Sequence, residues 1–189
     1  MALTEWMLQQ LRDQTRAWRA AASRLTRVGV TVDLDQLTLP QVCDILRAGI
    51  RGGLQPQYLA VEFRGGADVE PTQDDLETLA GLKKVGLRFV LDQFGGPDSS
   101  LLQLRWLPVD EVKIHPLFFQ SAGTHRDGGP LAAALLALAR RLGLLSIATG
   151  IETKRQLNLI EAQQYDEYQG PLTSSPMTAE VFAKKWLLA

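Results

Sequence analysis

The sequence predicts an α/β protein built on a parallel sheet. Short apolar segments alternate with segments of helical periodicity along the chain, and that alternation is typical of parallel strands joined by helices. The strand segments are apolar nearly throughout, as expected for strands covered on both faces. A polar residue stands at the end of each one, and in parallel α/β folds those ends form the face where sites are built. These residues are Asp33, Glu62, Asp92, Lys113, Thr149 and Gln169.

The segment before the first strand predicts an amphipathic helix, because its apolar residues recur at three- and four-residue steps. The residues that share this face are Leu8, Leu11, Thr15, Trp18, Ala22 and Leu25. Arg12, Arg16 and Arg19 share another face. Such a basic face either meets an acidic partner or is an ordinary solvated surface, and we take the solvated surface as the default.

The next elements have clear boundary signals. VTVDLD at residues 30–35 predicts a strand, and the following helix begins near Pro40, a residue suited to a first helical turn. Gly52 and Gly53 end that helix. YLAVEF at 58–63 predicts the second strand, and Thr72 with Asp75 resembles a capping pair that begins another helix, which ends near Gly86.

The remaining chain keeps the same order of strand and helix. The predicted strands are LRFVLDQF at 87–94, EVKIHP at 111–116, LLSIATGI at 144–151 and DEYQGPL at 166–172. The predicted helices cover 99–107, 131–142, 153–163 and 179–188. A loop that contains His125 precedes the Ala/Leu-rich helix, and we expect this histidine to be exposed.

Bulk properties exclude several classes of protein. The 189 residues suffice for one domain, and a formal net charge of −1 gives no field that would draw the chain to nucleic acid or to a membrane surface. Cys43 is the only cysteine, so no internal disulfide forms, and we expect a buried, inert thiol. No signal peptide or membrane span is visible, so we expect a cytoplasmic protein or the cytoplasmic part of a larger one.

The strand-end residues fall within motifs that follow one another along the chain. The motifs are VTVDLDQLTLPQV, VEFRG, DQFGGPDSS, LPVDEVKIH, ATGIET and DEYQGPLTSSP. In that order they resemble the EAL domain family of cyclic di-GMP phosphodiesterases. The resemblance implies a TIM-like barrel, of which this chain would supply about six of the eight parallel strands.

The family implies a site with two magnesium or manganese ions, which activate water against a phosphodiester. By this resemblance Glu62 and Asp92 stand at metal-ligand positions, and Lys113 stands where a lysine contacts the reacting water. Gln169 matches a late glutamine near the ligand, and Glu152 matches a supporting glutamate.

The sequence departs from the family pattern where the chemistry lies. The departures are Asp33 for a ligand asparagine, Gly65 for the second glutamate of E-x-T-E, Gln93 for the second aspartate of D-D, His115 for the aspartate after K-I, and Thr149 for the glutamate of A-E-G. An amide brings no charge to a dication, and a threonine cannot take a proton from water near neutral pH. We therefore expect Asp33, Glu62, Asp92, Gln93 and Gln169 to be vestigial ligand-binding positions, and Lys113, Thr149 and Glu152 to be vestigial catalytic positions, with no bound metal.

The first two family strands, with the E-A-L motif, have no counterpart in residues 1–189, so we expect a single degenerate, N-terminally shortened EAL-like domain. Its predicted function is catalytically inactive regulation through protein–protein interaction in bacterial cyclic di-GMP signalling. One alternative is a receptor that binds cyclic di-GMP without hydrolysis, and another is a divalent-metal phosphodiesterase. Cyclic di-GMP binding is the less favoured expectation.

An open sheet leaves two strand edges without partners. We therefore expect an oligomer or an obligate protein partner. The candidates for burial at such an interface are Trp6, Trp18, Trp106 and Trp186, although packing in the core is their default role.

Overall fold

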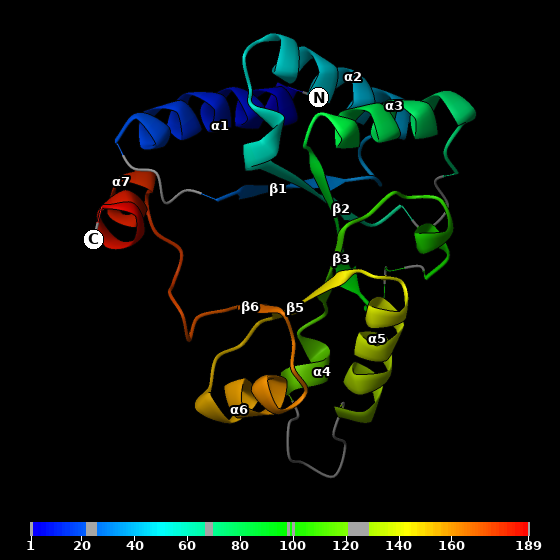
Figure 1. Cartoon of the computed structure of the whole chain (residues 1–189), viewed down its shortest axis with the longest axis vertical. Coiled ribbons are helices and arrows are strands. Elements are labelled where there is room, and N and C mark those ends of the chain that lie inside the picture. Colours follow the sequence, from blue (N-terminus) through cyan, green and yellow to red (C-terminus); the bar gives the residue numbers. More distant parts are fainter. Residues whose placement is uncertain are drawn as a thin grey trace. The chain divides into compact units, whose positions relative to one another are not determined.

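A computed structural model describes residues 2–21, 26–66, 70–97, 99, 101–120 and 129–188. Strands and helices alternate along the described chain (Figure 1). Ala22, Leu25 and His125 lie outside the described residues, so the expectations for them are not addressed.

Six strands form one sheet, and their order in the sheet is their order in the chain. They are β1 (Val28–Asp33), β2 (Leu59–Arg64), β3 (Arg88–Phe94), β4 (Glu111–Ile114), β5 (Leu145–Thr149) and β6 (Glu167–Gln169). The pairings of β3 with β4, β4 with β5 and β5 with β6 are parallel. The predicted α/β class with six parallel strands is therefore confirmed.

The helices follow the predicted order, with three differences. They are α1 (Ala2–Ala21), α2 (Leu39–Arg51), α3 (Gln73–Lys84), α4 (Leu117–Gln120), α5 (Gly129–Arg141), α6 (Lys154–Ala162) and α7 (Ala179–Phe182). The short helix α4 was not predicted. The predicted helix at 99–107 is a 3₁₀ segment, Leu101–Arg105. The N–H of Trp106 donates to the Gln103 carbonyl three residues earlier, which is the spacing of a 3₁₀ hydrogen bond. The helix predicted at 179–188 is an α-helix only over Ala179–Phe182 and continues as a π-helix, Ala183–Leu187.

Helix beginnings agree with the local signals in the sequence. The Thr72 hydroxyl accepts from the Asp75 N–H at 3.2 Å, and the Asp75 carboxylate accepts from the Thr72 N–H at 2.9 Å. The predicted capping pair is therefore present, and Thr153 with Gln156 repeats it at α6. Each pair satisfies donors of a first helical turn that have no partner within the helix.

The chain divides into two compact units. The first comprises Met1–Phe63, Asp68–Phe89 and Met177–Ala189, and the second comprises Arg64–Ala67 and Val90–Pro176. In the first unit Phe63 stacks on Phe89 with ring centroids 5.4 Å apart. The prediction of a single domain over residues 1–189 stays a prediction.

The second unit has a buried aromatic centre. Phe119 is fully buried, and the ring of Tyr165 meets it edge-on at 5.7 Å. The Tyr165 hydroxyl donates to the Ala132 carbonyl at 3.2 Å, and burial raises the pKa of Tyr165 to about 12. Tyr165 is therefore a structural residue that stays protonated.

The tryptophans only partly follow their default role. Trp18 is half-buried and packs on Phe182 at 5.3 Å, and Trp106 is half-buried. Core packing is wrong for Trp6 and Trp186, which are 55% and 41% exposed. Trp6 is exposed because it precedes Leu8, on the buried face of α1, by two residues and so lies on the far side of the helix.

Cys43 is buried in α2, and burial raises the pKa of its thiol to about 11. This confirms the expectation of a buried thiol, which near neutral pH carries almost no reactive thiolate. Across the described residues, no helix has the length and apolar character needed to span a membrane.

Candidate functional site

All six strand-end residues lie in the second half of their strands. Asp33, Thr149 and Gln169 are the last residues of β1, β5 and β6. In the second unit the strand register pairs Thr149 with Gln169. Glu62, Asp92 and Lys113 lie one or two residues before the ends of β2, β3 and β4, so the predicted strand-end position holds for three of the six residues. The chemical roles of all six stay predictions.

The first unit holds Glu62 and Asp33. The Thr31 hydroxyl donates to Glu62 Oε2 at 3.4 Å, and any side chain at Gly29 would collide with the Glu62 carboxylate. The Glu62 carboxylate thus lies directly over Gly29 of β1 and would have to move if this residue had a Cβ. Asp33 Oδ2 accepts from Gln36 Nε2 at 3.3 Å, which fixes Asp33 at the turn that follows the strand.

Asp92, in the second unit, is held by neighbouring groups of the chain. The guanidinium Nε of Arg64 lies 3.3 Å from Asp92 Oδ2, and Asp92 Oδ1 accepts from the Gln93 N–H at 2.9 Å. The Asp92 side chain is 13% exposed and that of Arg64 is 42% exposed. Sequence reasoning missed this ion pair, because the two residues are 28 positions apart.

Gln93 lies at an irregularity of the sheet. The register between β3 and β4 shifts between Leu91 and Phe94, which indicates a bulge. Gln93 has a φ of 55°, in the left-handed region that few residues other than glycine adopt. The backbone at the position of the family's second aspartate is therefore fixed in an uncommon conformation.

The carbonyl groups of Gly65 and Gly66 are bound by a buried side chain. Gln103 Nε2 donates to the Gly65 carbonyl at 2.8 Å and to the Gly66 carbonyl at 3.1 Å, and Gln103 is 1% exposed. Sequence reasoning missed this residue. The available signal was an amide within the apolar run LLQL, where a buried side chain needs a polar partner.

His115 closes the end of β4. Its N–H donates to the Phe94 carbonyl at 3.1 Å, and its Nδ1 accepts from the Leu117 N–H at 3.1 Å. Lys113, two residues earlier, is half-buried.

The hydroxyl of Thr149 is used within the sheet. Its Oγ1 donates to the Ile114 carbonyl at 2.6 Å. Gln169 is exposed and its carbonyl accepts from the Ile151 N–H at 3.2 Å. Glu152 is exposed, and its N–H donates to Gln156 Oε1 at 2.8 Å.

Asp166, which precedes β6, belongs to a network that the sequence analysis did not identify. Its Oδ2 accepts from the Ser146 N–H at 2.8 Å and from the Ser146 hydroxyl at 2.6 Å. Partial burial alone would raise the pKa of Asp166, but these two bonds and the charge of Arg140 act against it, and the net pKa is lowered. Asp166 thus ties the start of β6 to β5 in its charged form.

No group of three or more His, Cys, Asp or Glu side chains suited to a metal ion occurs among the described residues. The ligand roles of Glu62 and Asp92 therefore remain predictions.

Known protein families provide a comparison for this arrangement. Residues 1–176 match the model of the EAL domain. The bifunctional diguanylate cyclase/cyclic di-GMP phosphodiesterase MucR of Pseudomonas aeruginosa is 30% identical over 177 residues, which are 93% of this chain and 26% of MucR. The uncharacterized protein y4lL of Sinorhizobium fredii is 28% identical over 94% of this chain and 21% of its own length. The chain thus spans about a fifth to a quarter of the length of these two relatives.

Solved structures match over nearly the whole chain. A complex of the PaMucR phosphodiesterase with c-di-GMP has a TM-score of 0.81 and 29% identity, and the match covers 96% of this chain and 74% of that one. The EAL domain of DcpA from Mycobacterium smegmatis has a TM-score of 0.79 and 29% identity, with 96% and 82% covered.

Proposed function

Because the chain belongs to the EAL domain family, we propose that it is a catalytically inactive regulatory domain in bacterial cyclic di-GMP signalling and acts by binding protein. The proposal concerns what happens at the family's strand-end positions in this chain. Its support comes from the family residues that this chain replaces, and from the contacts that the replacing residues make.

The ion pair of Arg64 with Asp92 carries the proposal. In the family pattern, Arg64 occupies the threonine position of E-x-T-E and Asp92 is a metal ligand. Here the guanidinium lies 3.3 Å from one oxygen of Asp92, and the Gln93 N–H occupies the other. A dication at Asp92 would have to displace or tolerate the guanidinium of Arg64, and this opposes the family's metal pair at this position.

Thr149 supports the same conclusion for the proton transfer. The family has a glutamate at this position, and a carboxylate is a suitable general base near neutral pH. A threonine hydroxyl is not, and this one already donates to the Ile114 carbonyl at 2.6 Å. The reacting water would therefore have no base at this position.

Gln93 and Gly65 remove two further carboxylates of the pattern. Hard cations such as Mg²⁺ require anionic oxygen ligands, which neither residue supplies. The carbonyls of Gly65 and Gly66 are bound by Gln103. The strand ends of the second unit thus act as a structural network in this proposal.

A hydrolysis assay tests the loss of catalysis. The chain is incubated with cyclic di-GMP and Mn²⁺ or Mg²⁺, and the products are separated by chromatography. We expect no linear dinucleotide above the level of the buffer, while the EAL domain of PaMucR, assayed in parallel, serves as the positive control. Metal-dependent turnover by this chain, abolished by Asp92→Ala, would disprove the proposal.

The second candidate function is a receptor that binds cyclic di-GMP without hydrolysis. It is favoured by the retained residues Glu62, Asp92, Lys113 and Gln169, and by the similarity to a phosphodiesterase solved with c-di-GMP. Calorimetric titration with cyclic di-GMP distinguishes the two. Micromolar binding without hydrolysis would select the receptor, whereas no heat would leave the protein-binding function in place.

The outer strands of the sheet and the exposed apolar side chains of α1 support the proposed binding of a protein. Within the described sheet, β1 and β6 are the outer strands, and each has one neighbour. Leu3 and Trp6 of α1 are 67% and 55% exposed, and exposed aromatic and aliphatic side chains are typical of interfaces.

Light scattering after size exclusion, at several protein concentrations, tests self-association. We expect a dimer or larger species, shifted toward monomer by Trp6→Gln and not by Trp186→Gln. A monomer at all concentrations would exclude self-association and leave only a different protein as the partner.

A further inference from the structure

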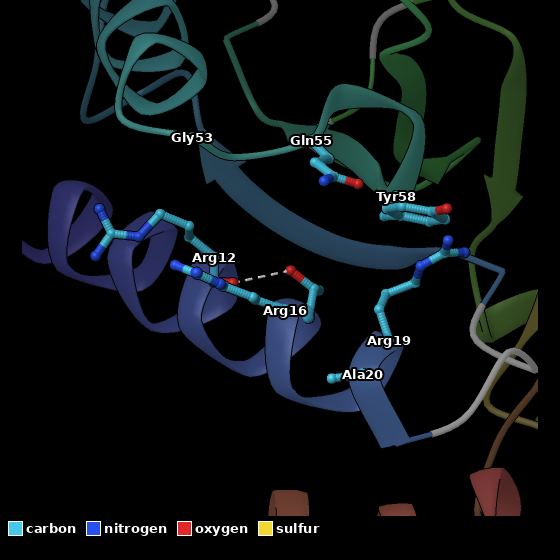
Figure 2. Close-up of a pocket in the computed structure, with 8 residues that line it drawn as sticks. Arg12, Arg16, Arg19, Ala20, Gly53, Gln55 and Tyr58 are labelled. Atoms are coloured by element: carbon cyan, nitrogen blue, oxygen red, sulfur yellow. Dashed lines mark hydrogen bonds between the residues drawn. The ribbon is translucent and has the colours of Figure 1, made fainter.

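We propose that α1 and the segment before β2 form a binding site for a small phosphate-bearing molecule, independent of the family's strand-end positions. The site is a pocket of about 530 Å³ in the first unit (Figure 2). It is lined by Arg12, Arg16, Arg19, Gln55 and Tyr58, among others. None of its described lining residues is acidic.

Tyr58 and Arg19 form one wall of the pocket. Figure 2 shows the Arg19 side chain extending from α1 over the Tyr58 ring, and its guanidinium carbon lies 4.3 Å from the ring centroid. A guanidinium that stacks on an aromatic ring keeps its N–H groups directed outward in the plane. The stacking therefore orients Arg19 and leaves its donors available to an anion.

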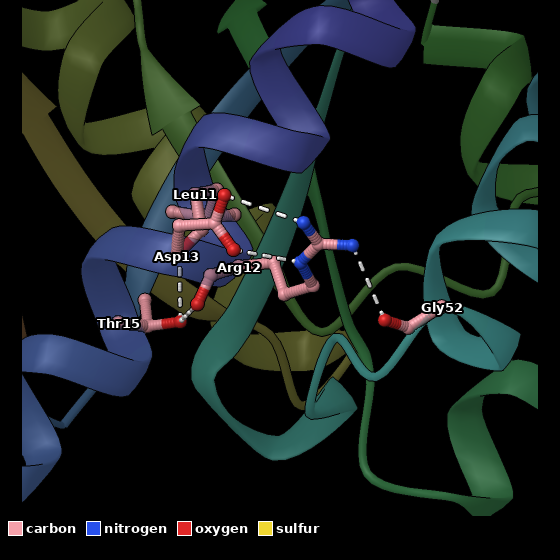
Figure 3. A network of polar contacts seen from close by, with 5 residues as sticks. All are labelled: Leu11, Arg12, Asp13, Thr15 and Gly52. Carbon is pink, nitrogen blue, oxygen red and sulfur yellow. Dashed lines mark hydrogen bonds and ion pairs between the residues drawn. The ribbon is translucent and has the colours of Figure 1, made fainter.

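Arg12 is fixed differently, as Figure 3 shows. Its guanidinium donates to both carboxylate oxygens of Asp13, at 2.9 and 3.2 Å, and to the Gly52 carbonyl at 3.3 Å. The adjacent Thr15 hydroxyl donates to the Leu11 carbonyl at 2.7 Å. Arg12 thus ties α1 to the end of α2, and its guanidinium is directly hydrogen-bonded to the carboxylate of Asp13.

Arg16 lies between these two fixed arginines on the same helix face, because residues 12, 16 and 19 are spaced by four and three. Neither Arg16 nor Arg19 has an ion pair within 4 Å of a carboxylate in the described part of the chain, although the charge of Arg16 also acts on Asp13. Three clustered cations with one neighbouring acid, Asp13, leave a local excess of positive charge. Positive charges that are held close together repel one another, and an anion that contacts several of them offsets this repulsion.

The shape of the pocket indicates the class of anion. Its volume lies within the roughly 300–1,000 Å³ that small-molecule sites occupy. The planar forks of arginine match phosphate oxygens in pairs. A compact group with several phosphates, such as a pyrophosphate or a nucleoside triphosphate, can contact Arg16 and Arg19 together, with Gln55 as a further polar contact.

The position of the pocket separates it from the family's site. Tyr58 immediately precedes β2, whereas Glu62 lies in the second half of that strand. The pocket therefore belongs to the strand's N-terminal end, and family-site residues take no part in it. Binding there would survive the loss of any ligand at Glu62.

Calorimetric titration with inorganic pyrophosphate, triphosphate and ATP, at low and at raised salt, tests the site. We expect saturable binding with one site per chain, weakened by salt, and weakened about tenfold or more in Arg16→Gln/Arg19→Gln. The matched control is Arg51→Gln/Arg141→Gln, which removes the same charge from exposed arginines outside the pocket. It should bind as the wild type does.

Each other outcome has a defined meaning. No binding at millimolar anion, or an equal loss in both double variants, would overturn the proposal. Stronger binding of a glutamate-rich peptide than of triphosphate would overturn it in favour of a protein ligand. ATP binding no tighter than triphosphate would support recognition of phosphate alone, and tighter ATP binding that Tyr58→Ala reduces would support a nucleotide.

Discussion

The strand ends of the second unit and the arginine pocket of the first unit are both polar, but they use their polar groups differently. At the strand ends, Asp92 is bound by Arg64, Thr149 donates to a backbone carbonyl, and Gln103 binds two more carbonyls. In the pocket, Arg19 stacks on Tyr58, and neither Arg16 nor Arg19 has an ion pair within 4 Å of a carboxylate among the described residues.

The difference concerns what each region can offer a ligand. A polar group bound within the chain contributes to stability, and a ligand must first displace its partner. A cation with no such partner costs the folded state some repulsion and gains by binding an anion. We therefore expect substitutions at the strand ends to change the free energy of unfolding, and substitutions in the pocket to change affinity.

The largest effect on stability is expected at Gln103. Replacing it by leucine leaves the Gly65 and Gly66 carbonyls without their donor in a buried place, which should cost about 2–4 kcal/mol of unfolding free energy. Urea denaturation measures this. Gln120→Leu is the control at an exposed glutamine, and a loss no larger than that of the control would show that the buried amide is not structural.

Thr149→Val comes next, because it keeps the shape and removes the hydroxyl that donates to the Ile114 carbonyl. We expect a loss of about 1 kcal/mol in the same measurement. Thr149→Ser retains the hydroxyl and should lose less. If valine proved neutral, the bond at 2.6 Å would be of no consequence to stability and the comparison would weaken.

Asp166 makes the stability depend on pH. Its pKa is lowered in the folded state, so its contribution is complete above the unfolded pKa and is lost as the pH falls through the folded one. Asp166→Asn should cost about 1 kcal/mol near neutral pH, a value reduced for the exposure of the group, and less in acid. Urea midpoints of both proteins across this pH range test the prediction, and a difference that does not change with pH would contradict it.

Arg64→Thr is expected to have the smallest effect on stability, below about 1 kcal/mol, because its ion pair is partly exposed. It should, however, release Asp92 and increase the heat of Mn²⁺ binding. Arg64→Lys keeps the charge and is the control. If the threonine variant binds Mn²⁺ no better than the wild type, the ion pair is not what opposes metal, and Gln93 and Gly65 become the explanation.

The fold was predictable because its signals are local. Caps such as Thr72 with Asp75 lie three residues apart, and apolar strands with polar ends show directly in the sequence. The helix predicted at 99–107 is instead a shorter 3₁₀ segment. The apolar periodicity of this stretch gave no sign that Gln103 is hydrogen-bonded to Gly65, 38 positions away.

The candidate sites were predictable only in part. The arginine face of α1 follows from helical spacing, but its neighbours Gln55 and Tyr58 become visible only in the folded chain. In the same way Asp92 could be located at a strand end, while its partner Arg64 could not be recognised from a sequence separation of 28. Contacts between distant segments depend on tertiary packing, which local patterns do not record.

The ion pair of Arg64 with Asp92 has a consequence for the conditions under which this domain can work. A strand-end carboxylate balanced by an arginine of the same chain needs no ion from the solution to balance its charge. The folded state would then be indifferent to chelators and to the magnesium and manganese supply of the cell. Under the proposed protein-binding function, such a domain would hold the same shape in metal-starved and metal-replete cells.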